Sequence, residues 1–207
     1  MTPAVRGLLL GAAALLTLAG GAAWVCPGNR CAVPALDAAG LGAAHESRAA
    51  WLDGLVQGVT WAGSLWLLLP LAILVAWRLS RCDGWQAASF VPAALLTATA
   101  LAHLAKLAVL RPRPELFPPL VAMPADASFP SAHAMQVSAL VLALLLRPGA
   151  QPGIAFWLAG VALIVLVAAS RVYLQLHFPS DVLAGIAAAV TLVLALRTLP
   201  CWRGAQP

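Results

Sequence analysis

Long apolar stretches, separated by short polar segments, make up most of the 207-residue sequence. These stretches are too long for β-strands and do not alternate between apolar and polar positions. Six of them approach the roughly 20 apolar residues that one transmembrane helix requires, the fourth being short. The pattern therefore predicts an all-α fold, a polytopic membrane bundle of six transmembrane helices, at Val5–Val25, Thr60–Trp77, Trp85–Leu110, Ala132–Leu146, Pro152–Ser170 and Val182–Leu199.

The composition supports a membrane protein and excludes the common soluble classes. Hydrophobic residues make up 62% of the chain and charged residues 9%, whereas soluble domains average about 45–50% apolar and about 25% charged residues. The polar surface is too small for a soluble globular enzyme, a disordered linker or a secreted disulfide scaffold. Residues 1–207 are expected to form a single membrane-embedded domain, with its motifs between residues 85 and 199.

The segment between the first two predicted helices, residues 26–59, is too polar to span a bilayer. It is expected to lie outside the membrane core and to include a helix along the interface. Cys26 and Cys31 would form a disulfide if this segment faces an oxidising compartment, and two free thiols fit the same spacing. The preceding apolar stretch resembles a signal peptide, but its length favours a retained helix.

The net charge of +5 raises the question of a nucleic-acid partner. The twelve lysines and arginines, however, are spread along the chain between apolar segments. No basic helix or aromatic platform accompanies them, so nucleic acid is excluded as a partner. The predicted partners are the bilayer and a lipid substrate, and nothing in the sequence specifies an oligomeric state.

Lysine and arginine in short loops predict the orientation of a membrane protein. With the N-terminus inside, six fall on each side, so the simple rule gives a tie. Four of the outer residues lie in segments with the character of a reaction site. Without these four, the balance favours two cytoplasmic termini and a site on the outer face. The membrane is expected to be a bacterial inner membrane. The inner set is Arg6, Arg78, Arg81, Arg147, Arg197 and Arg203, and the outer set is Arg30, Arg48, Lys106, Arg111, Arg113 and Arg171.

Three polar clusters interrupt the apolar segments, although a charge at the centre of a transmembrane helix costs about 2.5–3.5 kcal/mol. One closes the third predicted helix, at residues 106–114. A second opens the fourth helix, at residues 129–133, and a third joins the fifth helix to the sixth, at residues 170–181. The end of helix three, the start of helix four and the junction of five and six lie on one side of the membrane. The topology therefore predicts that all three clusters meet.

The cations of these clusters suit an anionic phosphoryl group. Lys106, Arg113 and Arg171 supply three positive charges, and a guanidinium fork matches phosphate oxygens. Ser131 and the backbone N–H groups at the start of the fourth helix are positioned to donate to an anion. Charge neutralisation and positioning are most of what phosphoryl transfer requires.

The same clusters contain two histidines and an aspartate. His133 and His177 offer a proton donor and a nucleophile. Asp181 follows His177 by four residues, within helical or turn reach of the imidazole, and is expected to fix the tautomer of the ring. Asp181 is also expected to act as a favourable negative charge at a helix N-terminus.

The three clusters resemble the signatures of the type 2 phosphatidic acid phosphatase (PAP2) superfamily. Those signatures are a lysine, six residues and Arg-Pro; Pro-Ser-Gly-His; and Ser-Arg, five residues, His, three residues and Asp. The order and the spacing agree, and Ala132 stands in place of the usual glycine. Here the signatures read Lys106…Arg113-Pro114, Pro130-Ser131-Ala132-His133 and Ser170-Arg171…His177…Asp181.

The resemblance implies an activity and a role for each signature residue. His177 would attack phosphorus and form a phosphohistidine, with Asp181 holding its ring. His133 would protonate the leaving oxygen, and no metal or other cofactor is implied. Alanine at position 132 excludes a positive φ but keeps its N–H, so activity is expected to persist. The phosphate-binding groups would be Lys106, Arg113, Ser131, Ala132 and Arg171.

Five further polar residues lie near the signatures. Arg111 falls outside the motif and is interpreted as an ordinary snorkelling side chain at the interface. His103, three residues before Lys106, is interpreted as a buried and satisfied histidine. Gln136, Gln175 and Tyr173 are candidates for substrate contact, weighed against the polar contacts that are common between membrane helices.

The leading hypothesis is a lipid phosphatase acting on undecaprenyl diphosphate, phosphatidic acid or phosphatidylglycerophosphate, with the first favoured by analogy to small relatives of this kind. A transporter or flippase for anionic headgroups is an alternative, but it would require polar groups at the bilayer midplane or paired broken helices. A phosphotransferase between lipid carriers is a third possibility. The PAP2 superfamily also includes the vanadium haloperoxidases, and this activity is disfavoured because those relatives are soluble.

Overall fold

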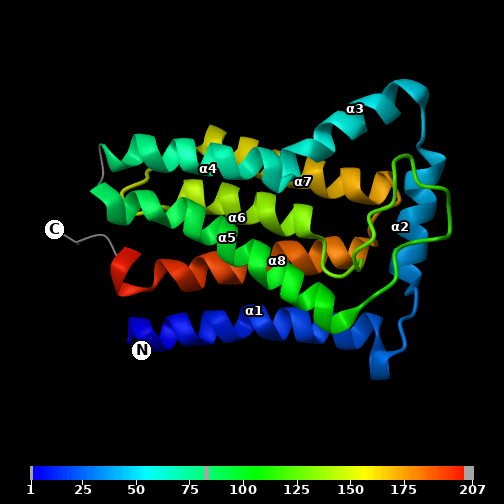
Figure 1. Cartoon of the computed structure of the whole chain (residues 1–207), viewed down its shortest axis with the longest axis horizontal. Coiled ribbons are helices and arrows are strands. Elements are labelled where there is room, and N and C mark those ends of the chain that lie inside the picture. The colour runs from blue at the N-terminus through cyan, green and yellow to red at the C-terminus, as the bar shows by residue number, and fades with distance from the viewer. Residues whose placement is uncertain (1, 82–83, 203–207) are drawn as a thin grey trace.

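A computed structural model describes residues 2–81 and 84–202 of the chain, and every regular element in these two ranges is a helix (Figure 1). The α-helices are α1 (Pro3–Val25), α2 (Ala35–Glu46), α3 (Ala50–Thr60), α4 (Leu65–Ser80), α5 (Gly84–Val109), α6 (Ala132–Leu146), α7 (Ile154–Tyr173) and α8 (Pro179–Arg197). Single 3₁₀ turns occur at η1 (Pro27–Asn29), η2 (Trp61–Gly63) and η3 (Pro200–Trp202). Arg203, one of the orientation residues, lies outside the described ranges.

Each predicted apolar stretch forms a helix, and local sequence sets several of the helix ends. Thr2 caps α1, because its hydroxyl accepts a hydrogen bond from the Val5 backbone N–H. Ser64 caps α4 in the same way, accepting from Trp66 N–H. Pro179 occupies the first position of α8, where its missing N–H costs no hydrogen bond.

Four of these helices, α1, α5, α7 and α8, are long and apolar enough to cross a membrane. A fifth candidate is a bent pair in which α3 and η2 meet α4 at 48°. Helix α6 is apolar but only 15 residues long. The apolar helices support an integral membrane protein, with four or five candidate spans in the described ranges.

Helix α6 is the central element of the bundle. It packs against α5, α7 and α8, while α1 packs along α8 and α4 along α5. Ten of the 15 residues of α6 are buried. The outer helices instead carry large exposed apolar side chains, such as Leu8, Trp66 and Phe156, as expected of surfaces that face lipid.

Residues 26–63 cover one end of the bundle. Figure 1 shows α2 lying across this end, over the loops that follow α5 and α7. Cys26 and Cys31 form a disulfide, so the alternative of two free thiols is wrong. Helices α2 and α3 follow the disulfide in this segment, and a position of either along the membrane interface stays a prediction.

Candidate active site

The three sequence clusters meet at the end of the bundle that α2 covers. Lys106 comes from the last turn of α5, His133 from the first turn of α6 and Arg171 from the last turn of α7. Arg113 and His177 lie in the adjoining loops. All five line one cavity of about 630 Å³, so the predicted convergence is observed.

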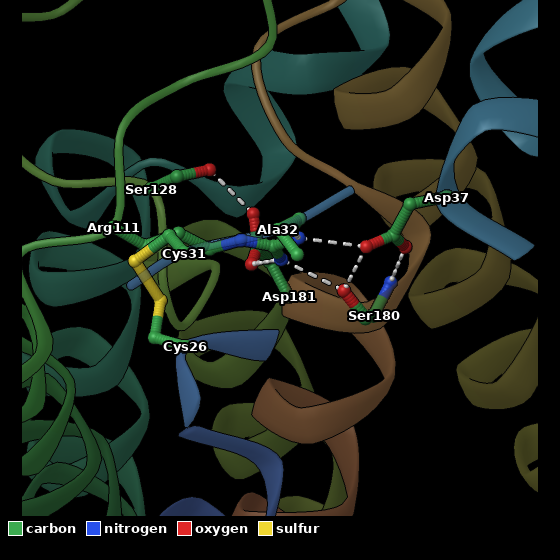
Figure 2. Close-up of a disulfide and its surroundings, with 8 residues drawn as sticks. All are labelled: Cys26, Cys31, Ala32, Asp37, Arg111, Ser128, Ser180 and Asp181. Atoms are coloured by element: carbon green, nitrogen blue, oxygen red, sulfur yellow. Dashed lines mark hydrogen bonds and ion pairs between the residues drawn. A yellow bond between two sulfur atoms is a disulfide. The ribbon is translucent and has the colours of Figure 1, made fainter. Parts of the chain in front are cut away.

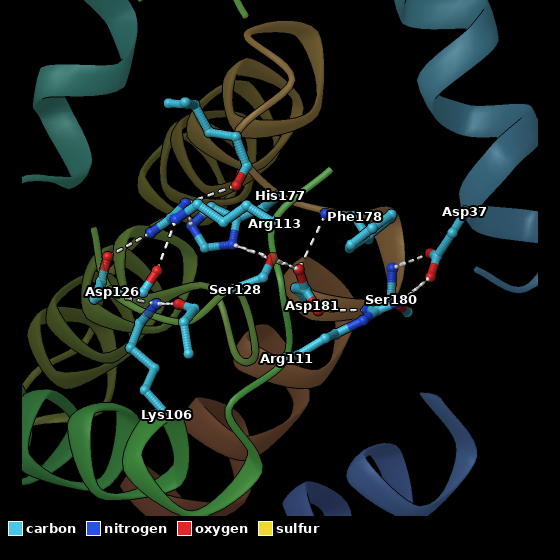
Figure 3. A network of polar contacts seen from close by, with 12 residues as sticks. Asp37, Lys106, Arg111, Arg113, Asp126, Ser128, His177, Phe178, Ser180 and Asp181 are labelled. Carbon is cyan, nitrogen blue, oxygen red and sulfur yellow. Dashed lines mark hydrogen bonds and ion pairs between the residues drawn. The ribbon is translucent and has the colours of Figure 1, made fainter. Parts of the chain in front are cut away.

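The imidazole of His177 is buried and is held between acidic and basic groups (Figure 3). Its Nδ1 lies 3.5 Å from Oδ2 of Asp181 and 3.5 Å from the Ser128 hydroxyl. Its Nε2 lies 3.3 Å from Nη1 of Arg113. Because a guanidinium can only donate, Nε2 must accept and the proton resides on Nδ1. The unprotonated nitrogen therefore faces the cavity.

The surroundings of His177 also keep its ring neutral. Burial lowers the pKa of His177 well below its ordinary 6.5, because an imidazolium would lose hydration. The cations of Arg171, Arg113 and Lys106 lower this pKa further. A neutral imidazole with a lone pair on Nε2 is the form that can act as a nucleophile.

Arg113 and Lys106 form one side of the cavity and share the carboxylate of Asp126. Oδ1 of Asp126 accepts from Nη2 of Arg113 at 2.6 Å, and Oδ2 lies 3.0 Å from Nζ of Lys106. Arg113 also donates to the backbone oxygens of Asp126 and Leu176, and Lys106 donates to that of Ala127. Partial burial raises the pKa of Asp126, but the bonds from Arg113 and Lys106 outweigh it and lower the pKa to about 2.

Arg171 supplies a third cation to the same cavity. Its Nη1 donates to the hydroxyl of Thr60 at 2.6 Å, which ties α7 to the end of α3. Its Nε is buried and lacks a hydrogen-bond partner among the described residues. A buried N–H without a partner is costly, and an anion in the cavity would satisfy it. We refer to Lys106, Arg113 and Arg171 as the cationic cradle.

The start of α6 presents His133 and Ala132 to the cavity. Ala132 begins the helix with helical backbone, so this position requires no positive φ and tolerates alanine. Ser131 is buried, is absent from the cavity lining, and its hydroxyl has no hydrogen-bond partner within the described ranges. Its backbone N–H donates to the carbonyl of Asp181 at 3.0 Å. The structure thus places Ser131 behind the cavity wall.

A close approach fixes the position of His133. A Cβ added to Gly63 would lie 2.5 Å from Cγ1 of Val167 and 3.0 Å from Cβ of His133. Distances this short are not tolerated without movement of a neighbour. Because residue 63 lacks a side chain, the η2 turn packs directly against the first turn of α6.

Two residues adopt the left-handed backbone region beside the site. Leu110, the residue after α5, has a φ of 51°, and Gln175, two residues before His177, has a φ of 60°. For residues other than glycine this region costs about 1–2 kcal/mol. Such strain gathers where neighbouring contacts hold the backbone, as at functional sites. Here Gln175 is held by its side chain, which donates to the Leu41 carbonyl of α2 at 3.0 Å.

The structure corrects the interpretation of Arg111 as a snorkelling side chain at the interface. Arg111 is 1% exposed and therefore does not snorkel to an interface. Its guanidinium contacts Asp181 at 2.6 Å and Asp37 of α2 at 2.8 Å. Residue type and spacing gave no sign of this pairing, because Asp37 lies 74 positions earlier in the chain.

Ser128 and Asp126 are two further site residues that the sequence analysis missed. Ser128 donates its hydroxyl to Oδ2 of Asp181, the same oxygen that faces His177. Oδ2 also accepts from the backbone N–H of Phe178 at 3.0 Å. Asp181 thus has both positions expected for it, beside His177 and at the start of α8.

The remaining polar candidates divide into two groups. His103 is exposed and lines the cavity, so the interpretation as a buried histidine is wrong. Gln136 also lines the cavity and donates to Thr99 at 3.3 Å. Gln175 and Tyr173 are instead absent from the cavity lining. Tyr173 donates its hydroxyl to Asp53 of α3 at 2.6 Å.

The cavity is apolar on the side formed by α4. Ser64 marks the start of that wall, and the apolar side chains follow along the helix. Trp66 is 86% exposed, so this wall continues onto the outer surface of the bundle. An anionic group in the cradle and an apolar chain along α4 would therefore fit one ligand; the apolar lining is Leu65, Trp66, Leu69, Pro70 and Ile73.

Within residues 2–81 and 84–202, no group of three or more His, Cys, Asp or Glu side chains is placed to hold a metal ion. The charged and imidazole groups that line the cavity are the three cations of the cationic cradle, the carboxylate of Asp126 and the rings of His103, His133 and His177. The nitrogen donors of this set can bind the oxygen atoms of an anion.

Fold and site together define a helical membrane protein with a cavity lined by three cations between its helix ends. The family model of the PAP2 superfamily matches residues 87–204, more than half of the chain. The chain belongs to the PAP2 superfamily, which confirms the resemblance seen in the three motifs.

Individual relatives support the same assignment. An undecaprenyl-diphosphatase of Sulfolobus acidocaldarius is 34% identical over 68% of this chain and 67% of its own length. Phosphatidylglycerophosphatase B of Bacillus subtilis is 32% identical over 80% of this chain and 84% of its own length. These relatives support a phosphatase, and hence hydrolase, activity.

A solved structure has a closely similar fold. It is the transmembrane PAP2-type phosphatidylglycerolphosphate phosphatase of Bacillus subtilis, with a TM-score of 0.74 and 26% sequence identity. The similarity covers 91% of this chain and 93% of that one. The agreement in fold extends beyond the motif region and supports the membrane setting of the bundle.

Proposed function

We propose that this protein hydrolyses a lipid phosphate or diphosphate through a phosphohistidine intermediate. The observation that carries the proposal is the cavity that brings Nε2 of His177 and the cationic cradle together beside an apolar wall. The cradle suits the phosphoryl group, and the wall suits the acyl or prenyl chains. Undecaprenyl diphosphate, phosphatidic acid and phosphatidylglycerophosphate are the candidate substrates, with the first favoured.

The first chemical step is attack by Nε2 of His177 on phosphorus. A nitrogen–phosphorus bond forms while the bond from phosphorus to the leaving lipid oxygen breaks. His133, in its protonated form, donates a proton to that oxygen. Asp181 stabilises the positive charge that develops on the ring of His177, since its Oδ2 faces Nδ1.

The second step is hydrolysis of the phosphohistidine. His133 takes a proton from water as the water oxygen bonds to phosphorus, and the bond to Nε2 breaks. Lys106, Arg113 and Arg171 neutralise the phosphoryl oxygens in both steps. We propose that these three cations take the role that metal ions have in other phosphatases. Ala132 also lines the cavity, where its backbone N–H is a further candidate donor to the phosphoryl group.

We also propose the topology in which this chemistry operates. Helices α1, α4, α5, α6, α7 and α8 would span the membrane as a single domain, with α2 and α3 along its outer interface. Both termini would then be cytoplasmic, and the site would open to the periplasmic or extracellular side. The count of cations outside the motifs favours this orientation.

The test is phosphate release by purified protein in detergent from each of the three candidate lipids, with and without EDTA. We expect release from at least one of them, insensitive to EDTA. The His177→Ala variant should lose at least about 10³-fold in rate while it still binds the lipid. No release by the wild type from any of these substrates would refute the proposal.

The same preparation distinguishes the alternatives. A transporter would move labelled lipid across vesicle bilayers equally well with His177→Ala. A phosphotransferase would pass labelled phosphate to an alcohol acceptor rather than to water, which product analysis detects. Release of inorganic phosphate as the sole labelled product supports the hydrolase.

A further inference from the structure

A buried cluster of charges lies directly behind His177, on the side away from the cavity (Figures 2 and 3). Arg111 forms ion pairs with Asp181 and with Asp37, and the three side chains are 1%, 0% and 0% exposed. Ser180 completes the cluster by donating its backbone N–H and its hydroxyl to Asp37, at 2.8 and 2.6 Å. Neither Asp37 nor Arg111 lines the cavity, so neither is placed to touch substrate.

The geometry of the cluster determines which oxygen of Asp181 faces His177. Arg111 donates to Oδ1 of Asp181 at 2.6 Å. Oδ2 is thereby left to Nδ1 of His177, together with the N–H of Phe178 and the hydroxyl of Ser128. Removal of the Arg111 contact would leave Oδ1 of Asp181 without its ion pair, and only the contacts from Phe178 and Ser128 would then hold the acceptor of Nδ1.

The charges of the cluster favour the same role. Asp37 and Asp181 together carry two negative charges, and Arg111 carries one positive charge, so the cluster has a net negative charge behind the imidazole. This charge stabilises the positive charge that develops on His177 during attack. Neutralising Asp37 would leave Arg111 and Asp181 to balance each other and would weaken that stabilisation.

A purely structural role would not require this arrangement. Buried ion clusters contribute little net stability, because desolvation offsets the attraction, and apolar replacements often serve as well. Here the cluster joins three distant segments to a single functional carboxylate. The cluster also contacts the outer segment through Ala32, whose carbonyl accepts from Nη2 of Arg111 at 3.2 Å (Figure 2). Ala32 directly follows the Cys26–Cys31 disulfide.

We propose that Asp37 and Arg111 are positioning residues for the nucleophile His177 and act through Asp181. The proposal rests on the phosphatase function proposed above. It makes the outer helix α2 part of the catalytic apparatus, because Asp37 is the residue by which α2 contacts the cluster. Both residues should support kcat and leave substrate binding in the cavity unchanged.

The experiment compares Asp37→Asn, Arg111→Lys and Arg111→Met with the wild type in phosphate release from a lipid substrate. Asp37→Asn keeps the shape of the side chain and removes its charge. We expect it to lower kcat about tenfold, with KM and the inhibition constant of inorganic phosphate within about twofold of wild type. Arg111→Lys should retain more activity than Arg111→Met.

Asp53→Asn is the matched control. It removes a carboxylate from the neighbouring helix α3, where Asp53 accepts from Tyr173 rather than from the cluster. Its kcat should equal that of the wild type. Tryptophan fluorescence during thermal unfolding monitors folding in every variant, so an unfolded Arg111→Met would leave Asp37→Asn and Arg111→Lys to decide.

A double-mutant cycle tests whether the effect passes through Asp181. In the Asp181→Asn background, Asp37→Asn should cause a clearly smaller loss of kcat than it does in the wild type. An equal loss in both backgrounds, or an Asp37→Asn enzyme with unchanged kcat, would overturn the positioning role. If the wild type itself releases no phosphate, the proposed function fails instead. The ¹⁵N resonances of His177 then provide the test, because they should change in Asp37→Asn and not in Asp53→Asn.

Discussion

The carboxylate of Asp126 accepts a 2.6 Å hydrogen bond from Nη2 of Arg113, on a side chain assigned to phosphate binding. Its other oxygen lies 3.0 Å from Lys106. Asp126 therefore presents two anionic oxygens to two cations of the cradle, as a phosphoryl group would. A bound phosphoryl group and this carboxylate would compete for the same donors.

Replacing Asp126 with asparagine should strengthen anion binding. The variant removes the competing charge while keeping the size of the side chain, so a bound anion would have full use of Lys106 and Arg113. We expect orthovanadate to inhibit at about tenfold lower concentration and KM to fall. Glu115→Gln, on the same loop and outside the cavity lining, is the control and should leave both values unchanged. Weaker inhibition of Asp126→Asn would show that Asp126 orients the cradle instead.

The enzyme should keep its kcat/KM to a lower pH than is usual for a histidine nucleophile. Burial and nearby cations lower the pKa of His177 below 6.5, so the reactive neutral ring persists as the pH falls through that value. We expect the acid limb of kcat/KM, on which the ring of His177 gains a proton, to have its midpoint below pH 6.5. Recovery of activity at neutral pH after each acidic incubation controls for unfolding. An acid limb with its midpoint at or above 6.5 would contradict this assignment.

The close packing at Gly63 predicts a specific sensitivity to one methyl group. Gly63→Ala would press against Val167 and His133, and we expect an activity loss of about tenfold or more, with destabilisation of about 1–3 kcal/mol. Gly58→Ala is the matched control, since an added Cβ there meets nothing within 4 Å. Thermal unfolding and phosphate release measure the two effects. Equal activities in the two variants would show that the close packing at Gly63 does not position His133 for catalysis.

The apolar wall of α4 should govern the recognition of the lipid chains. Leu69→Trp would narrow the cavity beside the cradle, so kcat/KM for a long-chain substrate should fall about tenfold. A short water-soluble phosphate ester should be affected much less. Leu67→Trp places the same side chain at a residue of α4 outside the cavity lining and serves as the control. A similar loss on both substrates would indicate damage to the phosphate site.

The sequence predicted the parts of the site that depend on local spacing. Helix ends on one side of a bundle must lie together, so the order of apolar stretches was enough to bring Lys106, His133 and His177 to one cavity. The helix at Ala132–Leu146 was predicted with its observed bounds. The shortness of α6 and the bend before α4 leave the count of six spans a prediction.

The spacing of residues in the sequence does not predict side-chain pairings between distant segments. Arg111 has the sequence context of an interfacial arginine, and only the fold brings Asp37 of α2 to it. The start of α6 predicts that Ser131 donates to an anion, but spacing does not reveal that its N–H donates to the Asp181 carbonyl. The cis peptide bond at Phe129–Pro130 likewise has no sequence signature beyond the proline itself. The sequence favours a buried His103, whereas the structure places its side chain at the cavity.

The cavity joins a charged end near Asp126 to an apolar side along α4. Turnover at such a site would deliver inorganic phosphate to water and the dephosphorylated lipid to the surrounding leaflet. Encounter with substrate then becomes a two-dimensional search, and the rate should follow the mole fraction of substrate among the lipids rather than its bulk concentration. Dilution with an inert neutral lipid should therefore slow the reaction even when the total amount of substrate is held constant.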